Sequence, residues 1–351
     1  MLTARHVGLR LFGKVALAYA LHYLGILHLW RRIVLKNRAV VLMYHRVLTA
    51  GEWEASGSHP GIVVTRETFS QHLAILRRYF CVLTPARFAH HLETQTPFPD
   101  SSCLITFDDG WLDNLSNGAG HLEQAQLTAV MFLPVNYLST QRCFWRESLA
   151  HLVAAAARRV EARVGTRSAL AEALRPFGLE PALDLRGPHL MEQVIQAVAG
   201  VNLRRDEAEQ LVTNLSAALG VDVRDLAGPD RLLAWSDLPR LARAGFTFAS
   251  HGSEHLRLAD VADDVARDDI MHSRGVLKTV ADSALAFSYP NGSWTPAVAA
   301  QVRAAGFQFA FTTEPGFISV HDDPMSLNRV NVHEDATFAP PLFLSRILGL
   351  F

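Results

Sequence analysis

The chain has 351 residues, of which 49% are hydrophobic and 19% charged, and its formal net charge is −1. This composition excludes a disordered chain and suits one large α/β domain or two smaller ones. A near-neutral charge and the lack of a recognition motif give no support to a nucleic-acid partner. The three cysteines (Cys81, Cys103 and Cys143) have no CxxC spacing, which argues against a disulfide framework and favours a reducing compartment.

The first segment, residues 1–38, is apolar and basic. Its longest stretch without Lys, Arg, Asp or Glu, residues 15–30, is shorter than the ~20 residues that a membrane-spanning helix needs. No small-residue cleavage site follows it, so we expect no cleaved signal peptide and a cytoplasmic protein. Three interpretations stay open: a helix packed on the domain, a helix resting on an anionic membrane surface at the periphery of the inner membrane, and a true anchor.

Six short apolar runs follow, and they are continuous rather than alternating, as parallel strands covered on both faces are. They are AVVLMYH (39–45), CLITFD (103–108), TAVMFLP (128–134), FTFASH (246–251), LAFSYP (285–290) and FQFAFTT (307–313). Helical patterns separate them, at 65–80, 84–93, 235–246 and 295–307. The first two begin at a threonine suited to an N-cap, and the last two end in Ala-Gly-Phe, with glycine as the C-cap. Alternating strands and helices predict a parallel α/β fold, with a barrel as the favoured form.

Two stretches break this rhythm. Residues 49–61 have the composition of a long loop after the first strand. Residues 147–233 are rich in Ala, Leu, Arg and Glu without any strand pattern, which predicts a helical insertion of three or four helices, with a separate domain as the alternative. The expected organisation is an N-terminal helical segment (1–38), a barrel domain (39–335) interrupted by this insertion, and a C-terminal tail (336–351).

Polar side chains gather where the predicted strands end. These ends are Tyr44-His45-Arg46, Asp108-Asp109-Gly110, His251 with His255, and Tyr289-Pro290-Asn291-Gly292. The carboxyl ends of parallel barrel strands converge on one face, where catalytic residues collect.

Two histidines four residues apart, together with a carboxylate, are a common ligand set for a hydrolytic metal ion. One of the adjacent aspartates would ligate the ion, and the other would accept a proton from the water that the ion activates. The alternatives are a pair of solvated loop histidines and a plain Asp-Asp-Gly turn.

Four motifs carry a family resemblance. LITFDDG (104–110), ASHGSEH (249–255), FSYPNG (287–292) and RVNVH (329–333) resemble, in this order, the successive motifs of the polysaccharide deacetylase family, also called carbohydrate esterase family 4 or the NodB-homology domain. LMYHRV (42–47) resembles the opening strand of the subgroup that contains the poly-N-acetylglucosamine deacetylases. The resemblance covers roughly 39–145 and 234–335. It implies an α/β fold, a distorted (β/α)7-type barrel with the helical insertion, and metal-dependent removal of an acetyl group from an N-acetylated sugar.

The resemblance also implies roles for individual residues. Asp108 matches the general base, and Asp109 matches a metal ligand that His251 and His255 complete. The ion of this family is commonly Zn²⁺, with Co²⁺ or Ni²⁺ also used. The backbone N–H of Asn291 matches the oxyanion donor.

His333 matches the histidine that protonates the leaving amine; the alternative is a surface histidine. Four further residues are candidates for lining the sugar site, with a structural role as the alternative: His45, Arg46, Trp111 and Tyr289.

The chain departs from the family pattern at one position. Many members carry an arginine where this chain has Ser288, and that arginine is thought to orient or tune the base. The departure leaves open how Asp108 is held, with Arg46 and Arg329 as the two substitutes.

The resemblance predicts a carbohydrate N-deacetylase. Its substrate would be an acetylated sugar of a polysaccharide, an oligosaccharide or a lipid-linked glycan. Two alternatives remain: a deacylase of a non-sugar amide on the same fold, and a non-catalytic sugar-binding relative. Since the metal-type ligands and the base are all present, the catalytic interpretations are favoured.

Overall fold

The computed structural model describes residues 4–140, 142–149, 151–152, 172, 175, 205–220, 222, 229–280 and 286–351. The chain divides into two compact units. The first comprises residues 1–49, 60–139 and 233–351, and the second comprises residues 50–59 and 140–232. Every residue of the predicted catalytic and metal site belongs to the first unit.

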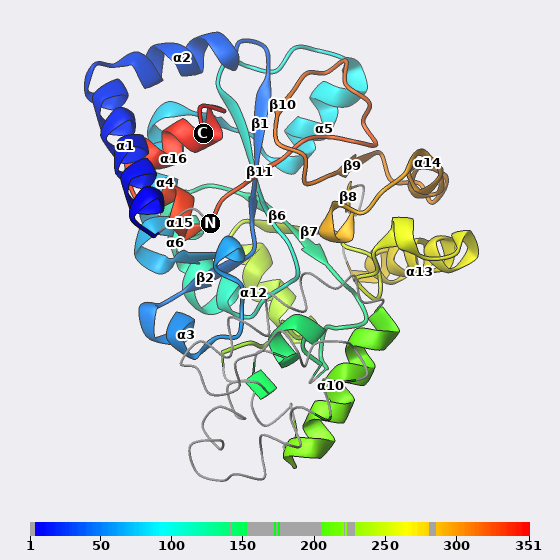
Figure 1. Cartoon of the computed structure of the whole chain (residues 1–351). Coiled ribbons are helices and arrows are strands. Elements are labelled where there is room, and N and C mark those ends of the chain that lie inside the picture. Colours follow the sequence, from blue (N-terminus) through cyan, green and yellow to red (C-terminus); the bar gives the residue numbers. More distant parts are fainter. Residues whose placement is uncertain are drawn as a thin grey trace. The chain divides into compact units, whose positions relative to one another are not determined.

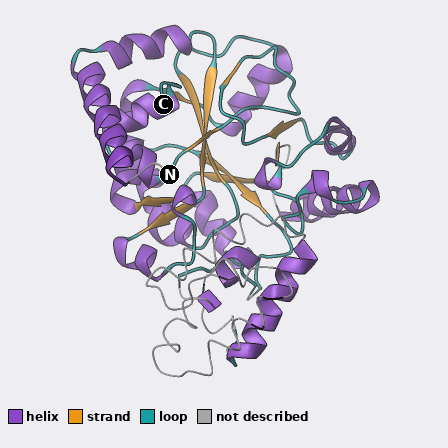
Figure 2. Ribbon diagram, in the orientation of Figure 1, coloured by secondary structure: helices purple, strands orange, loops and turns teal. Residues whose placement is uncertain are grey.

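The first unit is built around a curled sheet, for which the described residues supply nine strands (Figures 1 and 2). Its parallel neighbours, in spatial order, are β1 (Ala39–Tyr44), β5 (Ser102–Phe107), β6 (Ala129–Leu133), β7 (Phe246–Ser250), β8 (Ala286–Ser288) and β9 (Phe309–Phe311). Three two-residue strands complete it: β4 (Cys81–Val82) beside β5, β11 (Val330–Asn331) parallel to β1, and β10 (Phe317–Ile318) antiparallel to β1. The predicted parallel α/β architecture is confirmed.

One short segment brings the sheet back toward its first strand. Leu327 forms an isolated parallel bridge with Phe311 of β9, and three residues later Val330 pairs with Leu42 of β1. The curvature therefore matches a distorted barrel whose last side is a few residues long. Such a side is too short to produce an apolar run, which explains why the sequence pattern showed six strands only.

The predicted helices lie between the strands as expected. Their bounds, with those of the helices not predicted, are α4 (Arg66–Tyr79), α5 (Pro85–Thr94), α6 (Ala119–Ala125), α12 (Leu238–Arg243), α13 (Asp263–Val280) and α14 (Pro296–Ala304). Thr65 and Thr84 cap α4 and α5 by accepting hydrogen bonds from backbone N–H groups three residues on. Gly245 and Gly306 follow α12 and α14 with φ of 99° and 87°, as the predicted C-caps require.

The loop prediction for residues 49–61 is wrong in part. Residues Ala50–Ala55 form a short helix, α3, and Pro60–Ile62 form a 3₁₀ turn. The segments before and after them in the sequence, β2 (Arg46–Leu48) and β3 (Val63–Thr65), pair in parallel as a separate two-stranded sheet. Strands of three residues are too short to show periodicity, which is why the sequence analysis missed them.

The two ends of the chain are helical and packed together. The N-terminal segment forms α1 (Ala4–Tyr23) and α2 (Ile26–Val34), joined at Gly25, whose φ is 73°. No single helix of the described residues is long and apolar enough to cross a membrane; Phe12–Tyr23 and α2 pass that test only together, and they are bent by 85°. The segment expected as a C-terminal tail contains α16 (Pro340–Ile347), and α1 packs against it.

The predicted insertion falls largely outside the described residues. Within 147–233 the structure describes α10 (Arg205–Leu219) and a few further residues. The expected three or four helices therefore stay a prediction.

Alternate residues of the strands face two different apolar clusters. One cluster is enclosed by the curled sheet, since its members come from β1 and from the parallel strands β5, β6, β7, β8 and β9. It includes Val41, Leu104, Phe132 and Phe311. The intervening residues of β1, β5, β6 and β7 pack outward against α4 and α12. Those of β8 and β9 pack against α13 and α14. Phe311 has no exposed surface and contacts the rings of Phe88, Phe132 and Phe309.

Phe311→Ala should therefore destabilise the protein strongly, because it opens a cavity where the sheet turns back on itself. We expect the free energy of unfolding to fall by about 3–5 kcal/mol, measured by urea denaturation. The matched control Phe338→Ala removes a ring that is 42% exposed and should change it by less than about 0.5 kcal/mol. Equal losses in the two variants would contradict the enclosed cluster.

Candidate active site

The polar strand ends come together because the strands are parallel and in register. Asp108 follows β5, and its N–H donates to the Tyr44 carbonyl of β1 at 3.0 Å. His251 follows β7, and its N–H donates to the Leu133 carbonyl of β6 at 3.0 Å. Both residues thus extend the hydrogen-bonded ladder by one step, which places their side chains at the carboxyl edge of the sheet.

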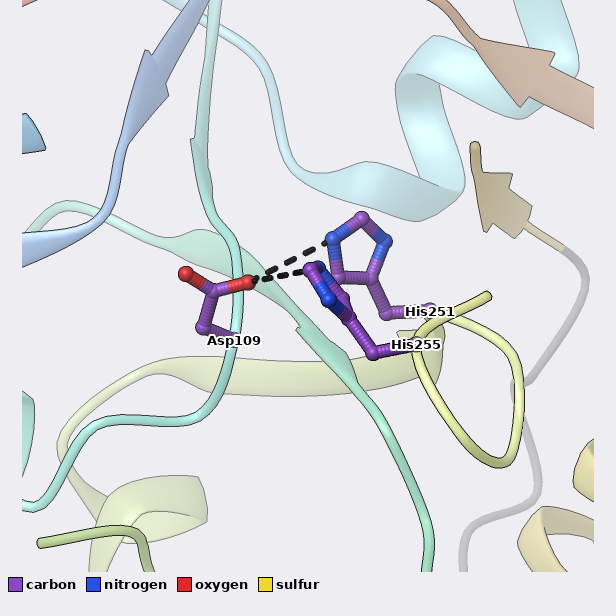
Figure 3. Close-up of side chains that lie close together, drawn as sticks. All are labelled: Asp109, His251 and His255. Atoms are coloured by element: carbon purple, nitrogen blue, oxygen red, sulfur yellow. Dashed lines mark ion pairs between the residues drawn. The ribbon is translucent and has the colours of Figure 1, made fainter. Parts of the chain in front are cut away.

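Asp109, His251 and His255 form a compact cluster of metal-type ligands (Figure 3). Oδ1 of Asp109 lies 3.5 Å from Nε2 of His251 and 3.3 Å from Nε2 of His255. One donor atom from each of the three residues lies within 4.8 Å of the other two. The predicted triad is therefore brought together.

The protonation of His251 tests whether a cation fits this cluster. Its Nδ1 lies 2.8 Å from the Ser288 carbonyl, which can only accept, so Nδ1 carries a proton. In the neutral imidazole, Nε2 then presents a lone pair to the Asp109 carboxylate, and two acceptors face each other. A cation between them resolves this conflict, and two imidazoles with one carboxylate are a donor set that Zn²⁺ accepts.

The loop that carries both histidines is held by a buried carboxylate that the sequence analysis missed. Asp269 of α13 accepts the backbone N–H groups of Ser253 and Glu254 at 2.9 and 2.8 Å. Gly252 has a φ of 73°, and a Cβ there would lie 2.5 Å from Asp269 Oδ2, so glycine is required at this position. An aspartate within a helical pattern gives no signal of such a role.

Trp111 orients the Asp109 carboxylate. Its Nε1 donates to Asp109 Oδ2 at 3.1 Å, which leaves Oδ1 for the two histidines. The indole has no exposed surface. The prediction that Trp111 lines the sugar site is therefore corrected, because a fully enclosed ring offers no face to a substrate.

Arg329 holds Asp108, which answers the question left by Ser288. Nη1 and Nη2 of Arg329 donate to Oδ1 and Oδ2 of Asp108, each at 2.7 Å. Nη2 also donates to Ser288 Oγ at 2.8 Å, and that hydroxyl lies 3.3 Å from Asp108 Oδ2. The guanidinium and the carboxylate are both buried, so this is a fork-to-fork pair shielded from water.

The electrostatics keep both aspartates ionised. Burial acts to raise the pKa of Asp108, but the guanidinium of Arg329 and the nearby His251 outweigh it and hold the pKa below its usual value. Burial acts on Asp109 in the same direction, and the electrostatic effect of the neighbouring His251 and His255 outweighs it, so its pKa lies well below the usual range. Burial lowers the pKa of His255, whereas Asp108 and Asp109 overcome burial and raise that of His251.

Arg46 pairs with Asp113 and not with Asp108, the partner considered in the sequence analysis. Its Nε and Nη2 donate to Asp113 Oδ2 at 3.0 and 2.9 Å, and its guanidinium lies 4.2 Å from the centre of the Trp111 ring. Arg46 has no exposed surface. Its predicted contact with substrate is corrected: it packs beneath the site and supports Trp111.

Tyr289 is also a core residue. It has no exposed surface, its hydroxyl donates to the Met325 carbonyl at 2.9 Å, and its ring stacks on Trp294. The predicted substrate contact by this side chain is corrected on the same ground. Asn291, two residues on, is exposed in a tight turn with φ of 54°, and its role as an oxyanion donor stays a prediction.

His45 and His333 end neighbouring strands at the same edge. His45 follows β1 and is half-buried; burial lowers its pKa, against the opposing effect of Asp109 and Asp108. His333 follows β11, where the N–H of Val332 donates to the Met43 carbonyl of β1 at 3.0 Å, and it is half-buried as well. Their expected roles, substrate binding and proton donation, stay predictions.

Arg329→Met should destabilise the protein by about 3–5 kcal/mol, because it leaves the Asp108 carboxylate buried without its charge partner. The double variant Arg329→Met/Asp108→Asn should recover a large part of that loss, since the unpaired charge is removed too. Urea denaturation of both variants measures the coupling.

Arg303→Met is the matched control, because Arg303 pairs with Asp323 at 3.1 Å on the surface. We expect that change to cost at most about 1 kcal/mol. A double variant that is no more stable than Arg329→Met would contradict the buried ion pair.

Comparison with known protein families gives one match. The family model described as polysaccharide deacetylase matches residues 198–310, which include His251, His255 and Asn291 but not the two aspartates. A search of curated proteins finds no match.

Solved structures share the fold at low sequence identity. IcaB from Ammonifex degensii has a TM-score of 0.57 and 17% identity, over 89% of this chain and 97% of that one. The Streptococcus pyogenes deacetylase PplD, in complex with acetate, has a TM-score of 0.56 and 14% identity, over 88% and 98%. A putative polysaccharide deacetylase from Bacillus anthracis has a TM-score of 0.53 and 17% identity, over 88% and 69%.

The family model thus agrees over residues 198–310 with the family that the motifs resemble, and solved structures of deacetylases share the fold of this chain.

Proposed function

We propose that this chain is a metal-dependent N-deacetylase that converts an N-acetylated sugar of a polysaccharide, an oligosaccharide or a lipid-linked glycan into an amino sugar and acetate. The observation that carries the proposal is the juxtaposition of two acids with different partners. Asp109 faces two imidazoles, and Asp108, next to it in sequence, is fixed by Arg329 with Oδ2 lying 3.8 Å from Nε2 of His251.

Asp109, His251 and His255 would hold the cation. Zn²⁺ is the favoured ion for two nitrogen donors and one oxygen donor, and Co²⁺ or Ni²⁺ suit the same set. When bound, such an ion supplies Lewis acidity, which lowers the pKa of water and polarises the acetyl carbonyl.

Asp108 would act as the general base toward the attacking water. Arg329 keeps it ionised, so it is ready to accept a proton at neutral pH. The same ion pair makes Asp108 a weaker base, which is tolerable only for a water that is already acidified. The bidentate grip also fixes the orientation of the carboxylate, so its position beside the ligand cluster does not depend on side-chain rotation.

His333 and Asn291 would serve the later part of the reaction. Addition of water to the acetyl carbonyl places negative charge on oxygen, which the backbone N–H of Asn291 would stabilise. Breaking of the carbon–nitrogen bond then releases acetate, and protonated His333 would give its proton to the departing amine. Both residues follow strands whose carboxyl ends lie at the edge that carries Asp108.

The substrate class is tested by acetate release from N-acetylglucosamine oligomers compared with small non-sugar amides. We expect release from the sugars. Turnover of the amides alone would identify a deacylase of another class, and no turnover of either would favour a sugar-binding relative.

Asp108→Asn should abolish turnover without loss of metal, because the amide cannot accept the proton of water but Asp108 is not among the ligands. We expect acetate release to fall by about 10²–10⁴-fold, with the metal content unchanged in elemental analysis. Asp260→Asn is the matched control, since Asp260 is exposed and pairs with Arg257. An active Asp108→Asn variant would refute the assignment of the base.

His251→Ala should lose bound metal, because it removes one of three ligands and the group that faces the Asp109 carboxylate. Elemental analysis after dialysis against a chelator is the measurement. His272→Ala, which removes an exposed histidine of α13, should keep its metal. Equal metal content in the two variants would remove His251 from the ligand set.

A further inference from the structure

Helix α2 has a buried face and an exposed apolar face. One face packs inward through Leu27 and Arg31, which are buried. The other consists of Ile26, Leu29, Trp30 and Ile33, spaced at i, i+3, i+4 and i+7, and these side chains are 38–61% exposed. A surface helix of a soluble domain normally turns polar residues outward, so the apolar composition of this second face is unusual.

Helix α1 extends this apolar surface. We call the N-terminal apolar surface the set Phe12, Leu17, Tyr19, Tyr23, Leu24, Ile26, Leu29, Trp30 and Ile33. These nine are most of the thirteen large hydrophobic side chains that are exposed in the described part of the chain. Exposed apolar side chains gathered on two neighbouring helices mark an interaction site.

The charged side chains of the N-terminal segment have one sign. Residues 1–38 contain seven Lys or Arg and no Asp or Glu, although the whole chain has a net charge of −1. Arg32 and Lys36 are exposed beside the α2 stripe, and the acidic side chain of Asp100 accepts the Asn37 N–H just beyond them. The N-terminal segment is thus a basic region on an otherwise acidic chain.

Helix α4 adds to the same basic region. The guanidinium of Arg31 donates to the Tyr79 carbonyl and lies 5.4 Å from the centre of the Phe80 ring, so the end of α4, with exposed Arg78, adjoins α2. The pKa of His28 is lowered by burial and further by its cationic neighbours, which include Arg31 and Arg78. The local potential is therefore positive.

We propose that the N-terminal apolar surface docks on an anionic lipid bilayer, with α1 and α2 lying in the interface. An apolar face bordered by basic side chains is the pattern of interfacial helices, because the face enters the acyl boundary while the cations meet lipid phosphates. Tyr19 and Tyr23 suit the headgroup level, where aromatic side chains with a polar atom are enriched.

Helix α2 lies at the end of the sheet opposite to the candidate active site. Leu35, next to the end of α2, accepts the Ser101 N–H at 3.0 Å, so α2 lies at the amino ends of β1 and β5 (Figure 1). Asp108 and Asp109 lie at the carboxyl end of β5. Six residues of strand, a length of about 20 Å, separate the two ends, so contacts of α2 with lipid would not cover the candidate site.

Sedimentation of the full chain with vesicles tests the proposal. We expect binding to vesicles of phosphatidylcholine with phosphatidylglycerol, no binding to phosphatidylcholine alone, and weakening with salt. Leu29→Ser/Ile33→Ser and Arg32→Glu/Lys36→Glu should each lower the partition coefficient by at least about tenfold. The matched controls on α13, Met271→Ser and Arg267→Glu, are exposed and should bind as the wild type does.

Circular dichroism and thermal unfolding verify that the variants are folded. Equal binding of all variants would overturn the proposal, and so would equal binding to vesicles with and without phosphatidylglycerol. So would resistance of vesicle-bound protein to alkaline carbonate, because that behaviour indicates a spanning segment. Sedimentation velocity without lipid tests whether the surface binds a second copy of the chain instead. A wild type that does not bind vesicles but forms a dimer, which Leu29→Ser/Ile33→Ser dissociates, would show that it does.

Discussion

The buried pair of Arg329 and Asp108 is the interaction on which the rest of the site depends. A carboxylate enclosed by protein would normally take up a proton, and here a bidentate guanidinium keeps it charged. The same contact joins β5 to the short segment that returns from β9 to β1, because Arg329 lies between Leu327 and Val330. One ion pair thereby links the curvature of the sheet to the state of the proposed base.

Around this pair, the remaining polar groups hold the residues of the candidate site in position rather than contacting a substrate themselves. Trp111 turns Asp109, Arg46 packs against Trp111, and Asp269 holds the loop between the two histidines. Each of these side chains is buried and hydrogen-bonded, as polar groups within a low-dielectric interior must be. The geometry of a few reacting groups therefore rests on a second set of side chains that never reaches the surface.

How far the sequence predicts this arrangement depends on the range of each interaction. The strands and the motifs with Asp108, Asp109, His251 and His255 are local patterns, and their placement followed from the rule that parallel strands end at one edge. The pairing of Arg329 with Asp108 and of Asp269 with the histidine loop joins distant residues, and no periodicity encodes it. Side-chain burial was the weakest prediction: Arg46, Trp111 and Tyr289 stand beside the motifs of the candidate site, yet their side chains are buried in the core.

The separation of Asp108 and Arg329 in the sequence also has a consequence for folding during synthesis. The two residues lie 221 positions apart, so the base remains without its cation while most of the polypeptide is being synthesised. Contacts of such long range form late, because the entropy of closing the intervening chain must be overcome first. Until the segment around Arg329 emerges, an open sheet edge and an uncompensated carboxylate coexist, and the nascent chain has neither a finished barrel nor a functional centre.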